Sequence, residues 1–180
     1  DARLVRMRIP DSRTVPAVVA AIGADARVAL AQPNFLYRPS QDAAARVQPA
    51  AVSGSGIQAS LQYALAAMNF AGAQRLAPNQ GRGARVAVID SGIDRTHPDF
   101  AAARIDEFDA FAGEKKSAED ADRHGTGIAG IIAARGTVQG VAPAADVLSA
   151  RVFRAKTGQA STATTQHILQ GITWSAERGA

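Results

Sequence analysis

Two residues of this chain have the chemical types and the surroundings of an acid–base pair. Asp90 directly follows the apolar run 85–89, and His124 opens a segment with helical periodicity 34 positions later. A histidine whose ring proton is held by a carboxylate can act as the general base of a nucleophilic hydrolase, because the carboxylate fixes the tautomer and stabilises the imidazolium. We therefore predict that the two side chains meet. Alone, Asp90 would only cap the following turn, and an isolated His124 would more often be a capping or surface residue.

Both candidates stand where a secondary-structure element ends or begins. The apolar run before Asp90 is typical of a strand buried on both faces of a parallel sheet, and ligands and catalytic groups gather outside the carboxyl ends of such strands. Backbone N–H groups of Ser91 and Gly92 are expected to keep the carboxylate ionised. His124 begins a predicted helix, 124–135, where the macrodipole disfavours a protonated ring unless a carboxylate lies beside it.

The rest of the pattern indicates the fold class. One or two short helices are predicted within 63–76, a strand at 147–153, and a last helix that Ser161 can cap, with apolar side chains at 168, 169, 172 and 176. Strands that alternate with helices predict an α/β domain with a mostly parallel sheet flanked by helices.

The composition divides the chain into three parts. Residues 1–39 have the pattern of strand, helix and strand, with alternation at 4–9, a helix from Thr14 and Pro16 to Gly23, and a second strand at 27–31. Residues 40–60 are rich in Ser, Gln, Ala, Pro and Gly, as expected of a linker. Residues 61–180 form the larger α/β unit.

The overall composition excludes several classes of function. The chain has 180 residues, a net charge of +4 and no cysteine, which excludes disulfides, thiolate zinc sites and cysteine nucleophiles. The basic residues are scattered singly, so we predict no nucleic-acid partner. No apolar run approaches the ~20 residues that would span a membrane.

A metal-dependent hydrolase is a minority alternative. Asp90, Asp94, His97, Asp99 and His124 supply ligand types, but their spacings match no compact ligand motif, and we predict no metal and no cofactor. Two further side chains, His167 and Trp174, are interpreted as a solvated residue and a packing residue.

The residues of the motifs and their order along the chain resemble those of the subtilase (subtilisin-like) serine peptidases. The resemblance covers about 61–178 and rests on Val-Ala-Val-Ile-Asp-Ser-Gly-Ile-Asp at 86–94, His-Pro-Asp-Phe at 97–100, His-Gly-Thr at 124–126, Ala-Gly at 129–130 and Gly-Val-Ala-Pro at 140–143. It implies a serine endopeptidase that hydrolyses peptide bonds of peptide or protein substrates through an Asp-His-Ser triad. By this resemblance Asp90 is the triad acid and His124 the general base.

The first part of the chain is similar to the later half of a subtilase propeptide, at 15–21, 28–31 and 32–37. The resemblance implies an α+β inhibitor and folding module that binds intramolecularly, with its tail added to a sheet edge near the cleft. It also implies a secreted or envelope-associated protein. Because the chain begins at Asp1 and not at Met, we expect a longer parent protein whose signal peptide lies outside this chain.

Three features depart from the family pattern. Gly127 stands where a second histidine is usual, and Arg123 where glycine is usual. The loop after Arg135 is shorter than the one that carries calcium in some subtilases, so calcium is not predicted even though Asp99 matches a contributing position. No serine here stands in the family's Gly-Thr-Ser context, so we expect the chain alone to be inactive. A non-catalytic, subtilase-fold binding domain is the alternative.

Overall fold

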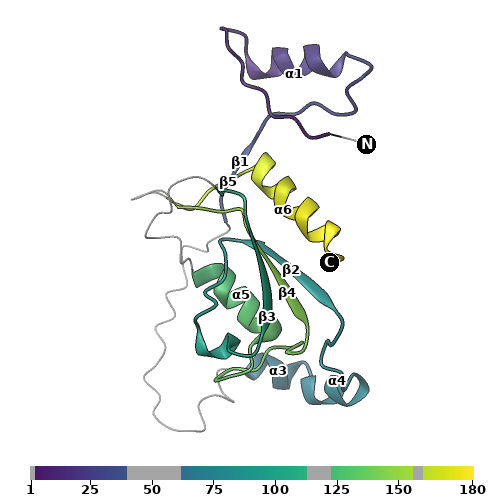
Figure 1. Ribbon diagram of the computed structural model, residues 1–180, viewed down its shortest axis with the longest axis vertical. Coiled ribbons are helices and arrows are strands. Elements are labelled where there is room, and N and C mark those ends of the chain that lie inside the picture. The colour runs from purple at the N-terminus through teal and green to yellow at the C-terminus, as the bar shows by residue number, and fades with distance from the viewer. Residues whose placement is uncertain (1–2, 40–61, 113–122, 156–159) are drawn as a thin grey trace.

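The computed structural model describes residues 3–39, 62–112, 123–155 and 160–180. Its centre is a three-stranded parallel sheet of β2 (Arg85–Asp90), β3 (Arg104–Asp109) and β4 (Asp146–Arg151), in the order β2-β4-β3 (Figure 1). The register pairs the strand starts Arg85 and Arg104 with Asp146, and the strand ends with Arg151. All three strands therefore end at one edge of the sheet.

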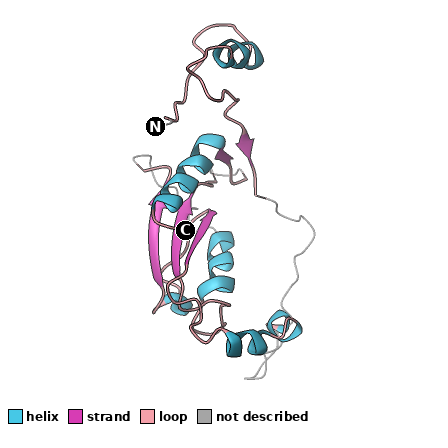
Figure 2. Cartoon of the chain, turned by 90° about the vertical axis from the view of Figure 1, so that its right-hand side faces the viewer, coloured by secondary structure: helices cyan, strands magenta, loops and turns pink. Residues whose placement is uncertain are grey.

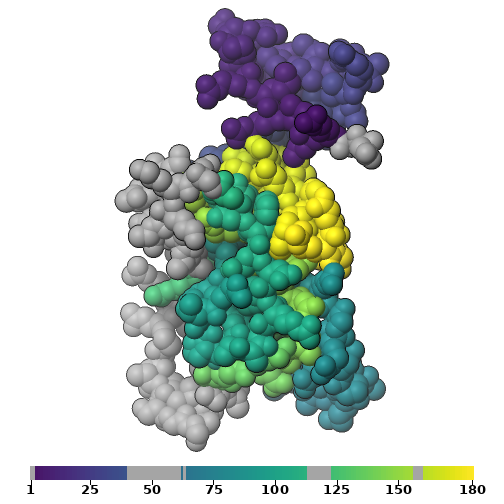
Figure 3. Space-filling model, in the orientation of Figure 1, coloured from purple at the N-terminus to yellow at the C-terminus, as the bar shows by residue number. Residues whose placement is uncertain are grey.

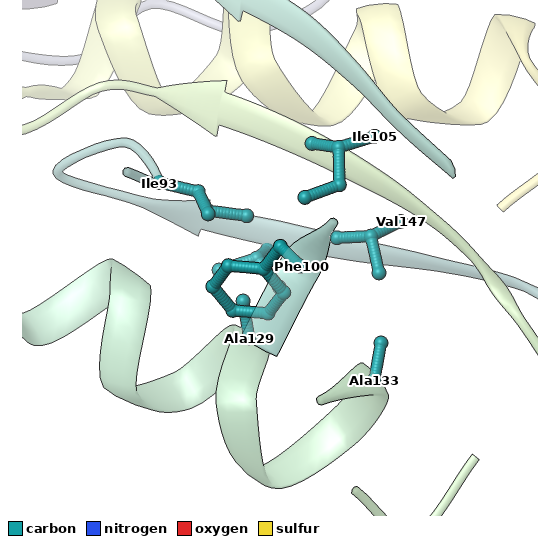
Figure 4. Packing of buried hydrophobic residues seen from close by; sticks show 7 residues of the cluster. Ile93, Phe100, Ile105, Ala129, Ala133 and Val147 are labelled. Carbon is teal, nitrogen blue, oxygen red and sulfur yellow. The ribbon is translucent and has the colours of Figure 1, made fainter. Parts of the chain in front are cut away.

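Helices cover both faces of this sheet, α5 (Arg123–Ala133) on one and α6 (Thr165–Glu177) on the other (Figure 2). Alternate strand residues supply the two cores. Figure 4 shows Ile93, Phe100, Ile105 and Val147 packing towards Ala129 and Ala133 of α5, in a cluster that also contains Val88. The opposite face packs Ala150 and Val152 with α6, where Trp174 stacks on Phe108 at 5.5 Å between ring centroids. The predicted fold class, α/β with a parallel sheet flanked by helices, is confirmed.

Most elements of the larger unit lie close to where the sequence predicts them. The strand before Asp90 and the helix that begins near His124 are present, and the region 63–76 forms α3 (Tyr63–Ala67) and α4 (Phe70–Leu76). The last helix starts later than predicted, because Thr164 and not Ser161 caps it: the Thr164 hydroxyl accepts the His167 N–H at 3.3 Å. The 3₁₀ turn η1 (Pro98–Phe100) precedes β3, a strand that the sequence analysis missed.

The N-terminal part contains less regular structure than predicted. Helix α1 (Val15–Gly23) is present, with Thr14 as its N-cap and Pro16 in its first turn. The strands predicted at 4–9 and 27–31 are wrong: neither segment pairs with a strand in the part of the chain that the structure describes, and Leu4, Met7 and Leu30 are exposed. A strand needs a neighbour to satisfy its backbone, and alternation alone does not supply one.

A short β-ladder connects this part to the larger unit. Strand β1 (Leu36–Tyr37) pairs antiparallel with β5 (Ala163–Thr164), immediately before α6. In the space-filling view, the N-terminal part forms a separate lobe above α6 (Figure 3). The linker predicted at 40–60 lies outside the described residues. Within the described ranges, no helix combines the length and the apolar character needed to cross a membrane.

Candidate active site

The structure brings the two sequence-predicted site residues into direct contact. Asp90 is the last residue of β2, and His124 lies in the first turn of α5, which packs against that strand. The Nδ1 atom of His124 lies 2.9 Å from Oδ1 and 2.8 Å from Oδ2 of Asp90. The Asp90 side chain is 15% exposed and that of His124 is 39% exposed. The carboxylate is thus mostly enclosed while the ring remains accessible to solvent.

Ser91 connects the carboxylate to the helix that carries the histidine. Its backbone N–H donates to Asp90 Oδ1 at 2.7 Å, and its hydroxyl donates to the same oxygen at 3.0 Å. The Ser91 hydroxyl also accepts the Gly125 N–H at 3.2 Å, and the residue is only 2% exposed. The Ser91 N–H therefore contacts the carboxylate as the sequence predicts, and the Ser91 hydroxyl adds a second bond to the same oxygen.

Backbone contact fixes how closely α5 approaches the end of β2. A β-carbon at Gly125 would lie 2.2 Å from the carbonyl oxygen of Gly92, so only glycine fits at this crossing. Gly92 itself has φ of +99°, a left-handed conformation that favours glycine. A further bond runs from the Asp94 N–H to the Thr126 hydroxyl at 2.9 Å. These contacts of Gly125 and Thr126 hold the first turn of α5, and with it His124, against the end of β2.

An ion pair between Arg151 and Asp109 lies beside Gly92. Arg151, at the end of β4, donates from Nη2 to Asp109 Oδ2 at the end of β3, at 2.5 Å, and the arginine side chain is 12% exposed. The Arg151 side chain also packs under Gly92, with its Cδ 3.2 Å from where a β-carbon would lie. The sequence analysis missed this pair, and the signal that could have found it is a charged residue at the end of each neighbouring strand.

Asp94 has a perturbed carboxyl group beside the site. The Thr96 hydroxyl donates to Asp94 Oδ1 at 2.6 Å, and the Thr96 backbone N–H donates to the same atom at 2.9 Å. These bonds, the side-chain one first, lower the pKa of the Asp94 carboxyl below its ordinary value. The Asp94 carboxylate thus accepts hydrogen bonds from Thr96 within its own turn.

The other candidate residues do not join the Asp90–His124 pair. His97 accepts the Asp99 N–H through Nδ1 at 3.2 Å, and Asp99 faces the loop 135–139. Among the residues that the structure describes, no group of three or more His, Asp or Glu side chains could hold a metal ion. His167 is not the solvated side chain that we predicted: its ring packs against Phe111 with centroids 4.4 Å apart.

Comparisons with known proteins agree with the motifs. A family model described as the subtilase family matches residues 81–180. The chain is 33% identical over 112 residues to the minor extracellular protease Vpr of Bacillus subtilis (strain 168), which covers 56% of the chain and 13% of Vpr. It is 32% identical over 105 residues to thermitase of Thermoactinomyces vulgaris, covering 56% of the chain and 36% of thermitase.

A third relative and one solved structure complete the comparison. The thermostable alkaline protease of Halalkalibacterium halodurans is 42% identical over 97 residues, covering 52% of the chain and 25% of that protein. The crystal structure of fervidolysin from Fervidobacterium pennivorans matches 59% of the chain and 17% of its own, with 29% identity and a TM-score of 0.46. The chain thus spans only 13% to 36% of the length of the three relatives.

Proposed function

This chain belongs to the subtilase family, and from that premise we propose that Asp90 and His124 are the acid and the general base of a serine endopeptidase. The single observation that carries the proposal is the contact of 2.8 Å between His124 Nδ1 and the Asp90 carboxylate. In a triad of this kind, the acid holds the Nδ1 proton, and Nε2 exchanges a proton with the nucleophile.

The proposed reaction is hydrolysis of a peptide bond in a peptide or protein substrate. His124 Nε2 takes the hydroxyl proton of a serine as its oxygen attacks the scissile carbonyl, and the Asp90 charge stabilises the imidazolium. The imidazolium then returns that proton to the leaving amine as the C–N bond breaks. Water repeats the sequence on the acyl-enzyme, with His124 again as the base, and releases the acid product.

The nucleophile is proposed to come from another part of a longer protein. No serine within residues 1–180 stands in a Gly-Thr-Ser context. Ser91, beside the acid, bonds Asp90 and the Gly125 N–H. We expect residues 1–180 alone to show no turnover, because removal of the serine from subtilisin, itself a subtilase, costs on the order of a million-fold in kcat.

Labelling of the full-length protein with a serine-directed fluorophosphonate tests the proposal. We expect the unmodified protein to be labelled, His124→Ala to abolish labelling, and His97→Ala, a histidine outside the pair, to leave it unchanged. Undiminished labelling of His124→Ala would remove this residue from the mechanism. A full-length protein that is never labelled would support the non-catalytic binding domain, and activity lost to chelators without labelling would support the metal hydrolase.

We further propose that residues 1–39 act as an intramolecular inhibitor of the same site. Support comes from β1, which adds to β5 as an extended peptide adds to a sheet edge. The Phe35 N–H donates to the Thr165 hydroxyl at 2.9 Å, and the Thr165 N–H donates to the Phe35 carbonyl at 3.0 Å. Asn34 Oδ1 accepts the Gln166 N–H at 3.0 Å, which satisfies a donor in the first turn of α6 that has no partner within the helix.

The inhibitor is tested by adding a synthetic peptide of residues 1–39 to full-length protein from which this segment has been removed. Asn34→Ala in the peptide should weaken inhibition about 2- to 10-fold, the usual effect of one hydrogen bond. The matched control is Asp11→Ala, since Asp11 bonds with Arg13 in its own turn. Equal inhibition by the two variant peptides would reject the role of Asn34, and no inhibition by the unmodified peptide would reject the inhibitor.

A location outside the cytoplasm is also proposed. The relative from Bacillus subtilis is named an extracellular protease, and a secreted or envelope-associated protein is what the sequence resemblance implies. Fractionation of cells that express the full-length gene tests this, and recovery of the protein from the cytoplasm alone would contradict it.

A further inference from the structure

The loop 135–139, between α5 and β4, is closed by its own backbone. A β-bridge pairs Arg135 with Gln139, and the Gly140 N–H donates to the Ala134 carbonyl at 2.9 Å. A β-carbon at Gly140 would lie 2.5 Å from the Ile132 carbonyl oxygen, so this end of the loop packs tightly on the last turn of α5. The loop is therefore compact and packs on the end of α5.

Asp99 accepts hydrogen bonds from two backbone N–H groups of this loop. Its side chain is buried, with the residue 5% exposed, and Oδ1 accepts the Thr137 N–H at 2.6 Å while Oδ2 accepts the Val138 N–H at 3.3 Å. The Asp99 carbonyl accepts the Arg135 N–H at 2.9 Å. A β-carbon at Gly136 would lie only 2.1 Å from Asp99 Oδ1, so the loop backbone packs directly on the carboxylate.

Gln62, near the start of the larger unit, forms two hydrogen bonds with the same loop. Its Nε2 donates to the Gln139 carbonyl at 2.7 Å, and its Oε1 accepts the Gln139 N–H at 3.0 Å. This pair joins residues 77 positions apart and fixes the segment that leads into α3. Both hydrogen-bonding ends of the carboxamide, and both backbone groups of Gln139, are used in it.

These contacts do not fit the calcium ion that some subtilases hold with a longer loop at this place. Calcium takes six to eight oxygen ligands. Here both oxygens of the Asp99 carboxylate face N–H groups, which carry partial positive charge where a cation would have to lie. The Gln62 oxygen and the Gln139 carbonyl, two further oxygens of this arrangement, already accept hydrogen bonds.

We propose that Asp99, Gln62 and the loop 135–139 form a metal-free clasp that holds the N-terminal end of the larger unit on α5 without calcium. The backbone N–H groups of Thr137 and Val138 donate hydrogen bonds to the buried carboxylate, and the Gln62 carboxamide pairs with the loop backbone. The local stability of this loop is therefore independent of calcium and of chelators, whatever the catalytic activity of the protein.

Hydrogen–deuterium exchange of the full-length protein tests the clasp, read on peptides that cover 135–140. All variants carry His124→Ala, which prevents self-digestion, so the result does not depend on the proposed peptidase activity. We expect the same exchange rate in calcium and in EGTA. Asp99→Asn should speed exchange at Thr137 and Val138 by about tenfold or more, because a charged acceptor is lost, and Gln62→Leu should speed exchange at Gln139 several-fold.

The control is Asp106→Asn, an exposed aspartate on β3, which should leave these rates unchanged. Since the readout is local, calcium bound elsewhere in the protein does not affect it. Slower exchange of 135–140 in calcium, lost in Asp99→Asn, would overturn the proposal in favour of a cation site. Rates in Asp99→Asn and Gln62→Leu that equal those of the control would overturn it by showing that neither side chain holds the loop. If Asp99→Asn fails to fold, Gln62→Leu and the comparison of calcium with EGTA still decide the outcome.

Discussion

Replacement of Gly125 by alanine should move His124 away from Asp90 without a change to either residue. A β-carbon at this position would lie 2.2 Å from the Gly92 carbonyl oxygen, whereas ordinary van der Waals contact begins at 3.4 Å. To accept Gly125→Ala, the first turn of α5 must move away from the end of β2 by about 1.2 Å, because both contacting groups belong to the backbone. The neighbouring His124 moves with that turn.

The displacement is large compared with the contact that it disturbs. A movement of that size along the line from His124 Nδ1 to Asp90 would stretch the 2.8 Å contact to about 4 Å, beyond hydrogen-bond reach. Misplacement of a catalytic group by about 1 Å costs on the order of 100-fold in rate. The same overpacking should lower the free energy of unfolding by about 1 to 3 kcal/mol.

Gly127→Ala is the matched control for this experiment. A β-carbon at Gly127 would meet no described atom within 4 Å beyond its chain neighbours and its own helix backbone, and the residue lies in the same helix two positions further on. There the change should raise the free energy of unfolding by about 0.5 to 1 kcal/mol, as expected for alanine in a helix interior. Fluorophosphonate labelling rates and urea unfolding of the full-length variants measure both effects. Equal labelling and equal stability of Gly125→Ala and Gly127→Ala would refute the reasoning.

Three further changes test other parts of the structure. Ser91→Ala removes the hydroxyl that bonds both the carboxylate and the first turn of α5, and should lower the labelling rate about tenfold; a rate equal to that of the unmodified protein would contradict this. Gly171→Ala places a β-carbon 2.8 Å from Val152 Cγ1 in the core beneath α6, and should cost about 1 to 3 kcal/mol in urea unfolding; a stability gain would show that the core gives way freely. Thr96→Val should raise the pKa of the Asp94 carboxyl towards its ordinary 3.8, as measured by NMR titration. Because the pKa of Asp94 is lowered in the folded protein, the stability that Asp94 contributes is present above pH 3.8 and is lost as the pH falls through the folded pKa. An unchanged pKa in Thr96→Val would reject the Thr96 hydroxyl bond as the cause of the shift.

The site residues were predictable because their positions follow from local rules. An apolar run that ends in Asp90 predicts a strand and the edge at which it ends, and the helical period after His124 predicts where the helix begins. The contact between them follows from parallel topology, which places strand ends and helix starts at one edge. Helix α1 was predictable for the same reason, since Thr14 and Pro16 mark its beginning.

The elements that were missed depend on partners far away in the sequence. Strand β3 carries charged residues at four of its six positions, and it becomes a strand because β4 pairs along its whole length. The segments 4–9 and 27–31 have a better strand pattern, but they pair with no strand among the described residues. In the same way, the sequence shows that position 125 is glycine but not that the Gly92 carbonyl lies against it.

The same geometry explains why the departures from the family pattern leave the acid–base contact intact. Position 127, where the family usually has a second histidine, has open space around its β-carbon position as far as the described residues reach, and Arg123 is exposed. Neither residue lies at the crossing of Gly125 with Gly92, which sets the distance between α5 and β2. The Asp90–His124 contact is held by backbone packing and by Ser91, so side chains on the open side of the helix are free to vary without moving it.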